Sequence, residues 1–264
     1  LDPTDINIFL IRADIKLWQS KHNEALDEVE YALTVASDKR DKCELYLEMA
    51  DIFEDQEKYT EVVDALKNAI LSDTKNEEAF NRFWFCTEIT ENYTDSIEFL
   101  SKLIDQSPYS HFAWFNLGHA YAGLKEYEKS LEAFEYAMAI DENFEPAYVC
   151  CGDVLYNLAR YSDSVLLYLD AIKLCKPDKE LYIKTAECYE RLGEYAKSRS
   201  YLRKALTVDP YFDEAFYRIG ETYRLEEKWR KAIVSFERAV KLSKENLDYL
   251  AALADAARAA GLEF

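Results

Sequence analysis

Apolar residues recur at spacings of three and four along almost the whole chain, with polar residues between them. The pattern i, i+3, i+4, i+7 predicts a succession of amphipathic helices of about 12 to 14 residues, joined by short turns. The chain of 264 residues contains 6 glycines and 5 prolines against 20 tyrosines and 14 phenylalanines. Few turn residues and many aromatic side chains favour long helices packed by large rings. We therefore expect an all-α fold.

The predicted helices repeat with a period of 34 residues. Such a period is typical of repeat proteins, in which each unit buries its apolar face only by stacking on its neighbours. One repeated place holds small residues, namely Ala50, Gly118, Gly152, Ala186, Gly220 and Ala254. A second place holds aromatic residues, namely Tyr46, Phe80, Trp114, Tyr148, Tyr182 and Phe216. A third place holds tyrosines, namely Tyr59, Tyr93, Tyr127, Tyr161 and Tyr195.

This pattern resembles the tetratricopeptide repeat family over nearly the whole chain. Residues 111–144 and 213–246 both supply the residues of the family pattern. The resemblance implies a right-handed superhelical solenoid of helix-turn-helix repeats, with a concave groove lined by the first helix of each repeat. The matching residues are Trp114, Leu117, Gly118, Tyr121, Ser130, Phe134 and Ala137 in one repeat, and Phe216, Ile219, Gly220, Tyr223, Ala232, Phe236 and Ala239 in the other.

We expect a single array over residues 1–264. The first repeat fits least well, because Arg12 and Lys16 stand in core places and "ASDKRDK" adds three residues before the next repeat. "LDP" at residues 1–3 and Gly261 match interior places of a repeat, so we expect a piece of a longer array. A natural N-terminus and an ordinary solvated C-terminal helix remain the alternative. The expected repeats are 6–42, 43–76, 77–110, 111–144, 145–178, 179–212 and 213–246, and residues 247–260 match a capping helix or a partial eighth repeat.

The repeat 77–110 breaks the pattern at two small places. Trp84 stands where the series has Gly or Ala, and Leu103 stands where five other repeats have Ala. Overfilling a close helix contact costs about 1 to 3 kcal/mol unless the backbones move apart. One interpretation is that the two helices of this repeat are splayed, with Thr87 making room. The other is that Trp84 is ordinary core that compensates for the small Thr87.

The resemblance also implies which residues line the groove. Phe85, Phe112 and Phe115 are expected to form an apolar patch at its centre, because exposed aromatic residues in a concave surface typically anchor a partner. The alternative is that neighbouring helices cover these rings. The polar residues expected to contact a partner are Asn81, Arg82, Asn116, Lys184 and Arg218, with His119 and Tyr217 beside them.

Charge differs along this expected groove. Acidic residues gather in the second repeat, and basic residues gather in the sixth and seventh. A partner segment with a basic end, an apolar centre and an acidic end would match this polarity, although runs of charge are also typical of solvated faces. The residues are Glu44, Glu48, Asp51, Glu54 and Asp55 on the acidic side, and Lys184, Arg191, Arg218 and Arg224 on the basic side.

The formal net charge is -19 with an isoelectric point near 4.6. Such a surface repels the phosphates of nucleic acid, so we expect a protein or peptide partner and no nucleic acid. No apolar run reaches about 18 residues, which predicts no membrane span. The six cysteines show neither CxxC nor metal spacing and are interpreted as free thiols. We expect a cytoplasmic protein, with a removed N-terminal signal as the alternative.

We expect neither an enzyme activity nor a cofactor. The sequence lacks glycine-rich phosphate loops and metal-ligand spacings. His119 and Cys150 form the one conceivable pair of base and nucleophile, but a free cysteine is more often a small buried hydrophobe. No three consecutive repeats supply the Lys, Asn and Arg with which some family members hold the C-terminal carboxylate of chaperone peptides.

We therefore expect a non-catalytic protein-protein interaction scaffold that binds a partner segment in the groove. Two alternatives stay open. One is a structural module that assembles with itself into homo-oligomers. The other is a targeting arm of a larger protein whose catalytic domain is not part of this sequence.

Overall fold

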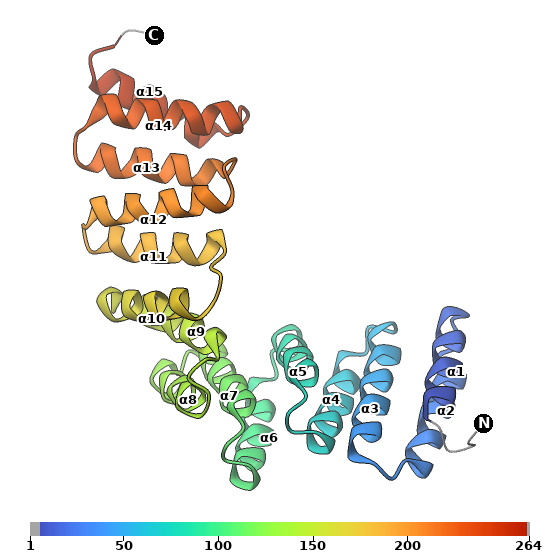
Figure 1. The fold of residues 1–264 in the computed structure, drawn as a ribbon. Helices are drawn as coiled ribbons and strands as arrows, with labels where there is room; N and C mark the ends of the chain where they lie inside the picture. Colours follow the sequence, from blue (N-terminus) through green and yellow to red (C-terminus); the bar gives the residue numbers. More distant parts are fainter. Residues whose placement is uncertain (1–5, 263–264) are drawn as a thin grey trace. The chain divides into compact units, whose positions relative to one another are not determined.

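The computed structural model describes residues 6–262, and within them fifteen α-helices follow one another without a strand (Figure 1). The expected all-α fold is confirmed. The chain divides into two compact units, residues 1–142 and 143–264. The first unit contains α1 Ile6–Trp18, α2 His22–Val35, α3 Lys39–Glu54, α4 Tyr59–Ser72, α5 Glu77–Thr90, α6 Tyr93–Gln106, α7 His111–Gly123 and α8 Tyr127–Ile140. The second contains α9 Glu145–Asn157, α10 Tyr161–Leu174, α11 Lys179–Arg191, α12 Tyr195–Val208, α13 Asp213–Leu225, α14 Trp229–Leu242 and α15 Leu247–Ala259.

Each odd-numbered helix up to α13 is followed by a tight turn and pairs with the next helix. The turn is made in the same way each time, by one residue in the left-handed conformation. Only glycine adopts this conformation without steric cost, so its use by other residues indicates that helix pairing imposes the turn. The left-handed residues are Ser20, Glu57, Glu91, Lys125, Ala159, Gly193 and Glu227, and Gly261 has the same conformation after α15.

The close approach of two paired helices depends on residues of complementary size. A Cβ atom on Gly118 would lie 2.6 Å from the ring of Phe134, and one on Gly220 would lie 2.4 Å from the ring of Phe236. Glycine in the first helix thus makes space for an aromatic ring of the second. Where the first helix has alanine, the second has the smaller leucine, as in the pairs Ala50–Leu66 and Ala186–Leu202.

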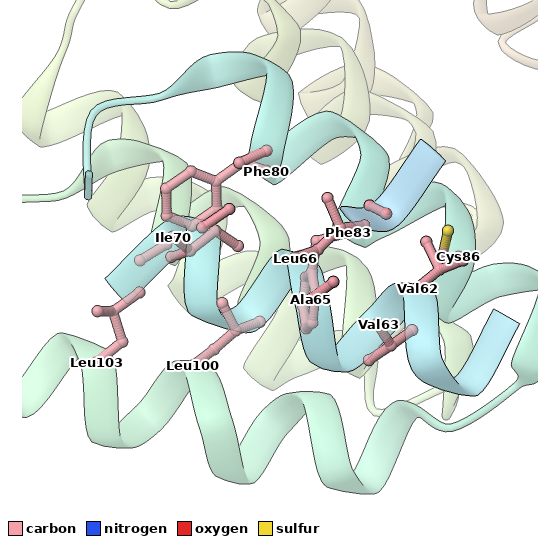
Figure 2. Close-up of a cluster of buried hydrophobic side chains, with 14 of the residues drawn as sticks. Val62, Val63, Ala65, Leu66, Ile70, Phe80, Phe83, Cys86, Leu100 and Leu103 are labelled. Atoms are coloured by element: carbon pink, nitrogen blue, oxygen red, sulfur yellow. The ribbon is translucent and has the colours of Figure 1, made fainter. Parts of the chain in front are cut away.

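The α5–α6 pair departs from this packing. Trp84 takes the small place while Leu100 stands opposite, so this pair must accommodate one additional large side chain. The backbones of α5 and α6 approach each other closely at far fewer positions than the two helices of any other repeat in the described residues. Phe83, Leu100 and Leu103 are buried, and Figure 2 shows the two leucines pointing from α6 toward apolar side chains of α4 and α5. The structure therefore agrees with the interpretation of splayed helices.

Hydrogen bonding between paired helices changes with this splaying. In α8, Ser130 donates from Oγ to the carbonyl oxygen of Gly118 at 2.7 Å, which ties the second helix to the first. Ser96 has the same repeat place in α6, but its Oγ lies 2.9 Å from Oγ1 of Thr87. Thr87 in turn donates to the carbonyl oxygen of Phe83 at 2.8 Å. Thr87 is thus a buried polar bridge between α5 and α6 as well as a small residue beside Trp84.

The irregular first repeat is accommodated by a longer helix. α3 begins at Lys39, four residues before the expected repeat boundary, and Asp38 caps it by accepting from the backbone N–H of Arg40 at 3.1 Å. The extra residues therefore lengthen a helix and do not widen a loop. Lys16 stands in a core place but its Nζ pairs with Glu28 at 2.9 Å, which compensates the charge.

The sequence predicts no membrane span and free cysteine thiols. No helix among residues 6–262 is both long enough and apolar enough to cross a membrane. The cysteines are free thiols. Burial raises the pKa of Cys43 and of Cys86 to about 11, so both thiols keep their protons at neutral pH.

Candidate interaction surface

One face of α5 presents what we name the α5 stripe: Asn81, Phe85 and Ile89. These residues follow one another at four-residue intervals and are all exposed, with 54% of the surface of Phe85 and 44% of that of Ile89 open to solvent. Residues one helical turn apart lie on the same face. The side chain of Asn76 caps the helix by accepting from the N–H of Ala79 at 2.8 Å. The stripe is therefore an apolar strip with an amide at one end, held on a capped helix.

A cluster of aromatic rings joins α5 to α7. Trp84 stacks on His119 with the ring centroids 4.2 Å apart, and Phe115 meets His119 edge to face at 4.5 Å. Burial lowers the pKa of His119 to about 4, so its ring is neutral at physiological pH. Phe115 is 8% exposed, because it packs within this cluster. The expected exposure of Phe115 is therefore wrong.

Phe112 and Asn116 of α7 are also withdrawn from solvent. Phe112 is half-buried and stacks on Phe80 with a centroid separation of 5.6 Å. Asn116 is 2% exposed, and its Nδ2 donates to the carbonyl oxygen of Phe112 at 2.9 Å. The expected patch of three open phenylalanines does not form, and of those three rings Phe85 is the exposed one.

The basic residues expected to contact a partner instead neutralise carboxylates of the preceding repeat. Arg82 bonds to Asp51 at 2.5 Å and to Glu54 at 3.0 Å. Lys184 bonds to Asp153 at 2.5 Å. Arg82 and Lys184 lie on first helices, 31 residues after Asp51 and Asp153, and each joins its helix to the preceding first helix. We call three contacts of this spacing the cross-repeat ion pairs: Arg82–Asp51, Lys184–Asp153 and Arg218–Glu187.

Arg218 is the most enclosed of these three cations. Besides Glu187, it contacts Glu190 at 2.9 Å and Glu214 at 3.4 Å, and 17% of its side chain is exposed. Burial opposes the charge, but the carboxylates around it prevail and raise the pKa of Arg218. The neighbouring Tyr217 stacks on Tyr249 of α15 with a centroid separation of 4.8 Å. Both residues are therefore engaged within the second unit.

The basic character expected in the last repeats is largely neutralised in the same way. Arg224 pairs with Glu221 at 2.7 Å, and Arg191 is exposed and donates from Nε to the hydroxyl of Tyr156 at 3.2 Å. Lys184, Arg218 and Arg224 thus all contact carboxylates. The basic end expected for the groove is therefore mostly paired, and of its four cations Arg191 is the one without a carboxylate contact among the described residues.

α3 shows the opposite imbalance. In α3, Glu48 stands at the repeat place that holds the cation in the cross-repeat ion pairs. In α1, Asp14 stands at the repeat place that holds the carboxylate. Oε1 of Glu48 is buried and has no hydrogen-bond partner among the described residues. Burial raises the pKa of Glu48 to about 7; the charges of Asp14 and Asp51 add to this effect, and Arg82 opposes it. This region of the first unit therefore carries an excess of carboxyl groups.

The two residues considered as a base and a nucleophile do not have suitable proton affinities. Burial raises the pKa of Cys150 to about 12 and lowers the pKa of His119 to about 4. At neutral pH the thiol keeps its proton and the imidazole is a weak base, whereas nucleophilic catalysis needs a thiolate or an effective base. In residues 6–262, no group of three or more His, Cys, Asp or Glu is arranged to hold a metal ion.

Known proteins share both the sequence pattern and the fold. Models of the tetratricopeptide repeat match residues 111–144, 180–212 and 214–244. The Hsp70-Hsp90 organizing protein of Triticum aestivum is 25% identical over 125 residues, which is 47% of this chain and 21% of that protein. Anaphase-promoting complex subunit 3 of Schizosaccharomyces pombe is 22% identical over 194 residues, or 73% of this chain and 28% of that protein. The chain thus spans less than a third of either relative.

A solved structure with a similar fold is that of YrrB, described as a TPR protein with an unusual peptide-binding site. It superposes with a TM-score of 0.59 at 20% identity, covering 72% of this chain and 98% of YrrB. At this level of identity the similarity concerns the fold alone. The tandem helix pairs, the recurrent left-handed turn and the three family matches show that this chain contains tetratricopeptide repeats.

Proposed function

We propose that this protein is a non-catalytic scaffold that binds a segment of another protein on the first helices of its repeats, with the α5 stripe as the main contact. The observation that carries this proposal is the exposure of Phe85 and Ile89, one turn apart on a helix whose other large apolar residues are buried or half-buried. Exposed aromatic and aliphatic side chains in such a row are typical of binding anchors.

Covering the stripe would contribute substantially to the affinity for a partner. A phenylalanine side chain presents roughly 200 Å² in total, so covering the exposed half of Phe85 removes about 100 Å² from water. At about 25 cal/mol per Å², this burial contributes roughly 2 to 3 kcal/mol, or about 30-fold to 150-fold in affinity. Ile89 adds a smaller apolar contact, and Asn81 supplies an amide that bonds to the backbone of an extended or helical segment.

The relatives support a role in protein assembly. By their names, one organises Hsp70 and Hsp90 and the other is a subunit of the anaphase-promoting complex. YrrB is described as having a peptide-binding site. The Lys, Asn and Arg pattern for a chaperone C-terminus is not supplied by consecutive repeats, so we propose a segment of a different kind. The weak base His119 and the protonated thiol Cys150 support a role without catalysis.

The proposal is tested by capture of partners from lysate with three forms of the protein. The first is the natural chain, and the second carries Phe85→Ala and Ile89→Ala. The third is a control with Leu71→Ala, since Leu71 is 51% exposed but lies on the second helix α4. Circular dichroism first establishes equal folding. Capture of a protein by the natural chain and the control, but not by the double variant, would support the proposal. Identical capture by all three forms would contradict it.

Self-association is a second candidate function, supported by the exposed face of α1. Ile11, Ile15 and Trp18 are 58%, 45% and 85% exposed, and their spacing places them on one side of the helix. An exposed row of large apolar residues is costly unless another surface covers it. Light scattering over a concentration series measures association of the protein with itself. A constant monomer mass over the whole series would refute this candidate, and a mass increase that Trp18→Ala abolishes would support it.

A further inference from the structure

The surroundings of the α5 stripe carry a clear excess of negative charge. Arg82 lies next to the stripe on the same helix and contacts three carboxylates at once: Asp51 and Glu54 of α3, and Glu78 of α5 at 3.8 Å. Those three side chains keep 48%, 41% and 65% of their surface exposed. One guanidinium therefore balances only one of three accessible carboxylates.

The same excess continues along both helices. Glu88 is exposed directly beside Ile89 on α5. Directly after α3, Asp55 is 56% exposed and has one oxygen 2.6 Å from Nε2 of His22. Glu48 stands in the place where a cross-repeat ion pair would have its cation, so the expected compensation of this region is missing. In the second unit Lys184 and Arg218 fill that place, whereas in α3 the carboxyl group of Glu48 adds to the negative charge around Arg82.

We propose that the partner segment is basic: it carries lysine or arginine side chains flanking one or two large apolar residues. The inference rests on the proposed function. The apolar residues of the segment cover Phe85 and Ile89, while its cations lie against the free oxygens of Asp51, Glu54, Glu78 and Glu88. Charge complementarity selects this occupant, because an acidic segment would meet only like charge and one already paired arginine.

The geometry favours a segment in which charge and apolar character alternate by helical turns. Phe85 and Ile89 are separated by one turn, about 6 Å along α5. Glu78 lies near the start of the helix, before the apolar contact, and Glu88 lies between Phe85 and Ile89 in the sequence, so cations are required before the apolar contact and alongside it. Arginine serves well here because a planar guanidinium bonds to two carboxylate oxygens at once and also stacks on an aromatic ring such as Phe85.

The test uses two synthetic fluorescent probes and needs no knowledge of the natural partner. Both probes are peptides of about 14 residues, which is the length of one repeat helix, and their leucines lie one helical turn apart. They differ only at the polar positions, which are lysine and arginine in the basic probe and glutamate in the acidic probe. Fluorescence anisotropy with the whole chain gives the dissociation constants. We expect the basic probe to bind at least about tenfold more tightly than the acidic probe at low ionic strength, and to weaken in high salt.

Variants locate the binding and separate it from non-specific attraction to an acidic chain. Glu88→Lys should weaken the basic probe by about tenfold. Lysine near the C-terminus of α5 is compatible with the helix dipole, so the fold is retained. The matched control is Glu132→Lys, which makes the same charge change at an exposed position on the second helix α8. Equal weakening by both variants would show diffuse attraction and overturn the inference.

The outcomes for this inference and for the proposed function are distinct. Phe85→Ala should weaken the basic probe by at least about tenfold, because it removes the apolar contact while leaving the carboxylates in place. An acidic probe that binds as tightly as the basic one, and depends on Phe85, would overturn the basic specificity and leave the scaffold function intact. Binding of the basic probe that is indifferent to Phe85 would contradict the site itself.

Discussion

Replacement of Glu48 by glutamine tests whether an unpaired carboxyl group destabilises the first unit at neutral pH. Asp14 of α1, Asp51 of α3 and Arg82 of α5 face this group, and its Oε1 has no hydrogen-bond partner in the described residues. Glutamine keeps the shape of the side chain and removes its charge. The new amide also offers N–H donors to the carboxylates of Asp14 and Asp51.

The expected magnitude follows from the proton affinity. Burial first, and the neighbouring carboxylates second, raise the pKa of Glu48 from 4.5 to about 7. The folded state therefore binds this proton more tightly than the unfolded state, and stability falls as pH rises from 4.5 to about 7. A difference of that size corresponds to about 3 kcal/mol, because each pKa unit is worth about 1.4 kcal/mol. Below pH 4.5 the side chain is protonated in both states and this contribution disappears.

The assay is urea unfolding followed by circular dichroism, for the natural chain and for Glu48→Gln, at several values from pH 4 to pH 8. The two free energies of unfolding should be similar at pH 4, and the variant should be more stable by about 2 to 3 kcal/mol at pH 8. Glu135→Gln, at an exposed position of α8, is the control for generic charge removal. A difference between the natural chain and Glu48→Gln that stays constant with pH, or a variant that is less stable at pH 8, would refute the reasoning.

Three further substitutions test packing, turn geometry and charge within the repeats. Gly220→Ala should destabilise the protein by about 1 to 3 kcal/mol in urea unfolding, because its new Cβ would lie 2.4 Å from the fully buried ring of Phe236. Ala159→Gly should raise the free energy of unfolding by about 1 kcal/mol, because Ala159 has a φ of 57° that only glycine adopts without strain; an unchanged value would contradict the account of the turn. Arg218→Ala should lower the melting temperature and should reduce the free energy of unfolding by about 2 to 4 kcal/mol, because enclosed carboxylates lose their cation. An unchanged free energy of unfolding would show that these carboxylates are already solvated.

The helix positions and turns were accessible from sequence because they depend on local spacing. The 34-residue step fixes which residues face inward, and the turn at Gly193 recurs at that step with non-glycine residues in the other repeats. The early start of α3 was not predicted, because extra residues between repeats extend a helix or a loop equally well by pattern alone. Asp38 decides the outcome by capping the helix at that point.

The site was only partly predictable, because exposure depends on neighbours far apart in sequence. Asn81 and Phe85 are exposed as expected, but Phe115 and Asn116 are enclosed by rings and helices that the repeat pattern does not specify. The cations were expected to be available, and Arg82 is instead paired. That pairing had a sequence signal, since opposite charges recur 31 residues apart. This recurrence is visible only when a charged residue is compared with residues of the adjacent repeat, because the paired charges do not lie on one helix.

Trp84 connects the exceptional packing of its repeat to the exposed stripe. A glycine or alanine at this place would not restore a close α5–α6 contact by itself, because Leu103 also fills a small place. With both large residues present, the backbones of α5 and α6 stay apart, and the indole stacks on His119 of α7. The ring contacts of Trp84 thus hold α5 against α7. Phe85, the residue after Trp84, faces solvent. The tryptophan therefore acts as core on one side of the helix, and by that packing it fixes the helix whose other side presents the proposed binding residues.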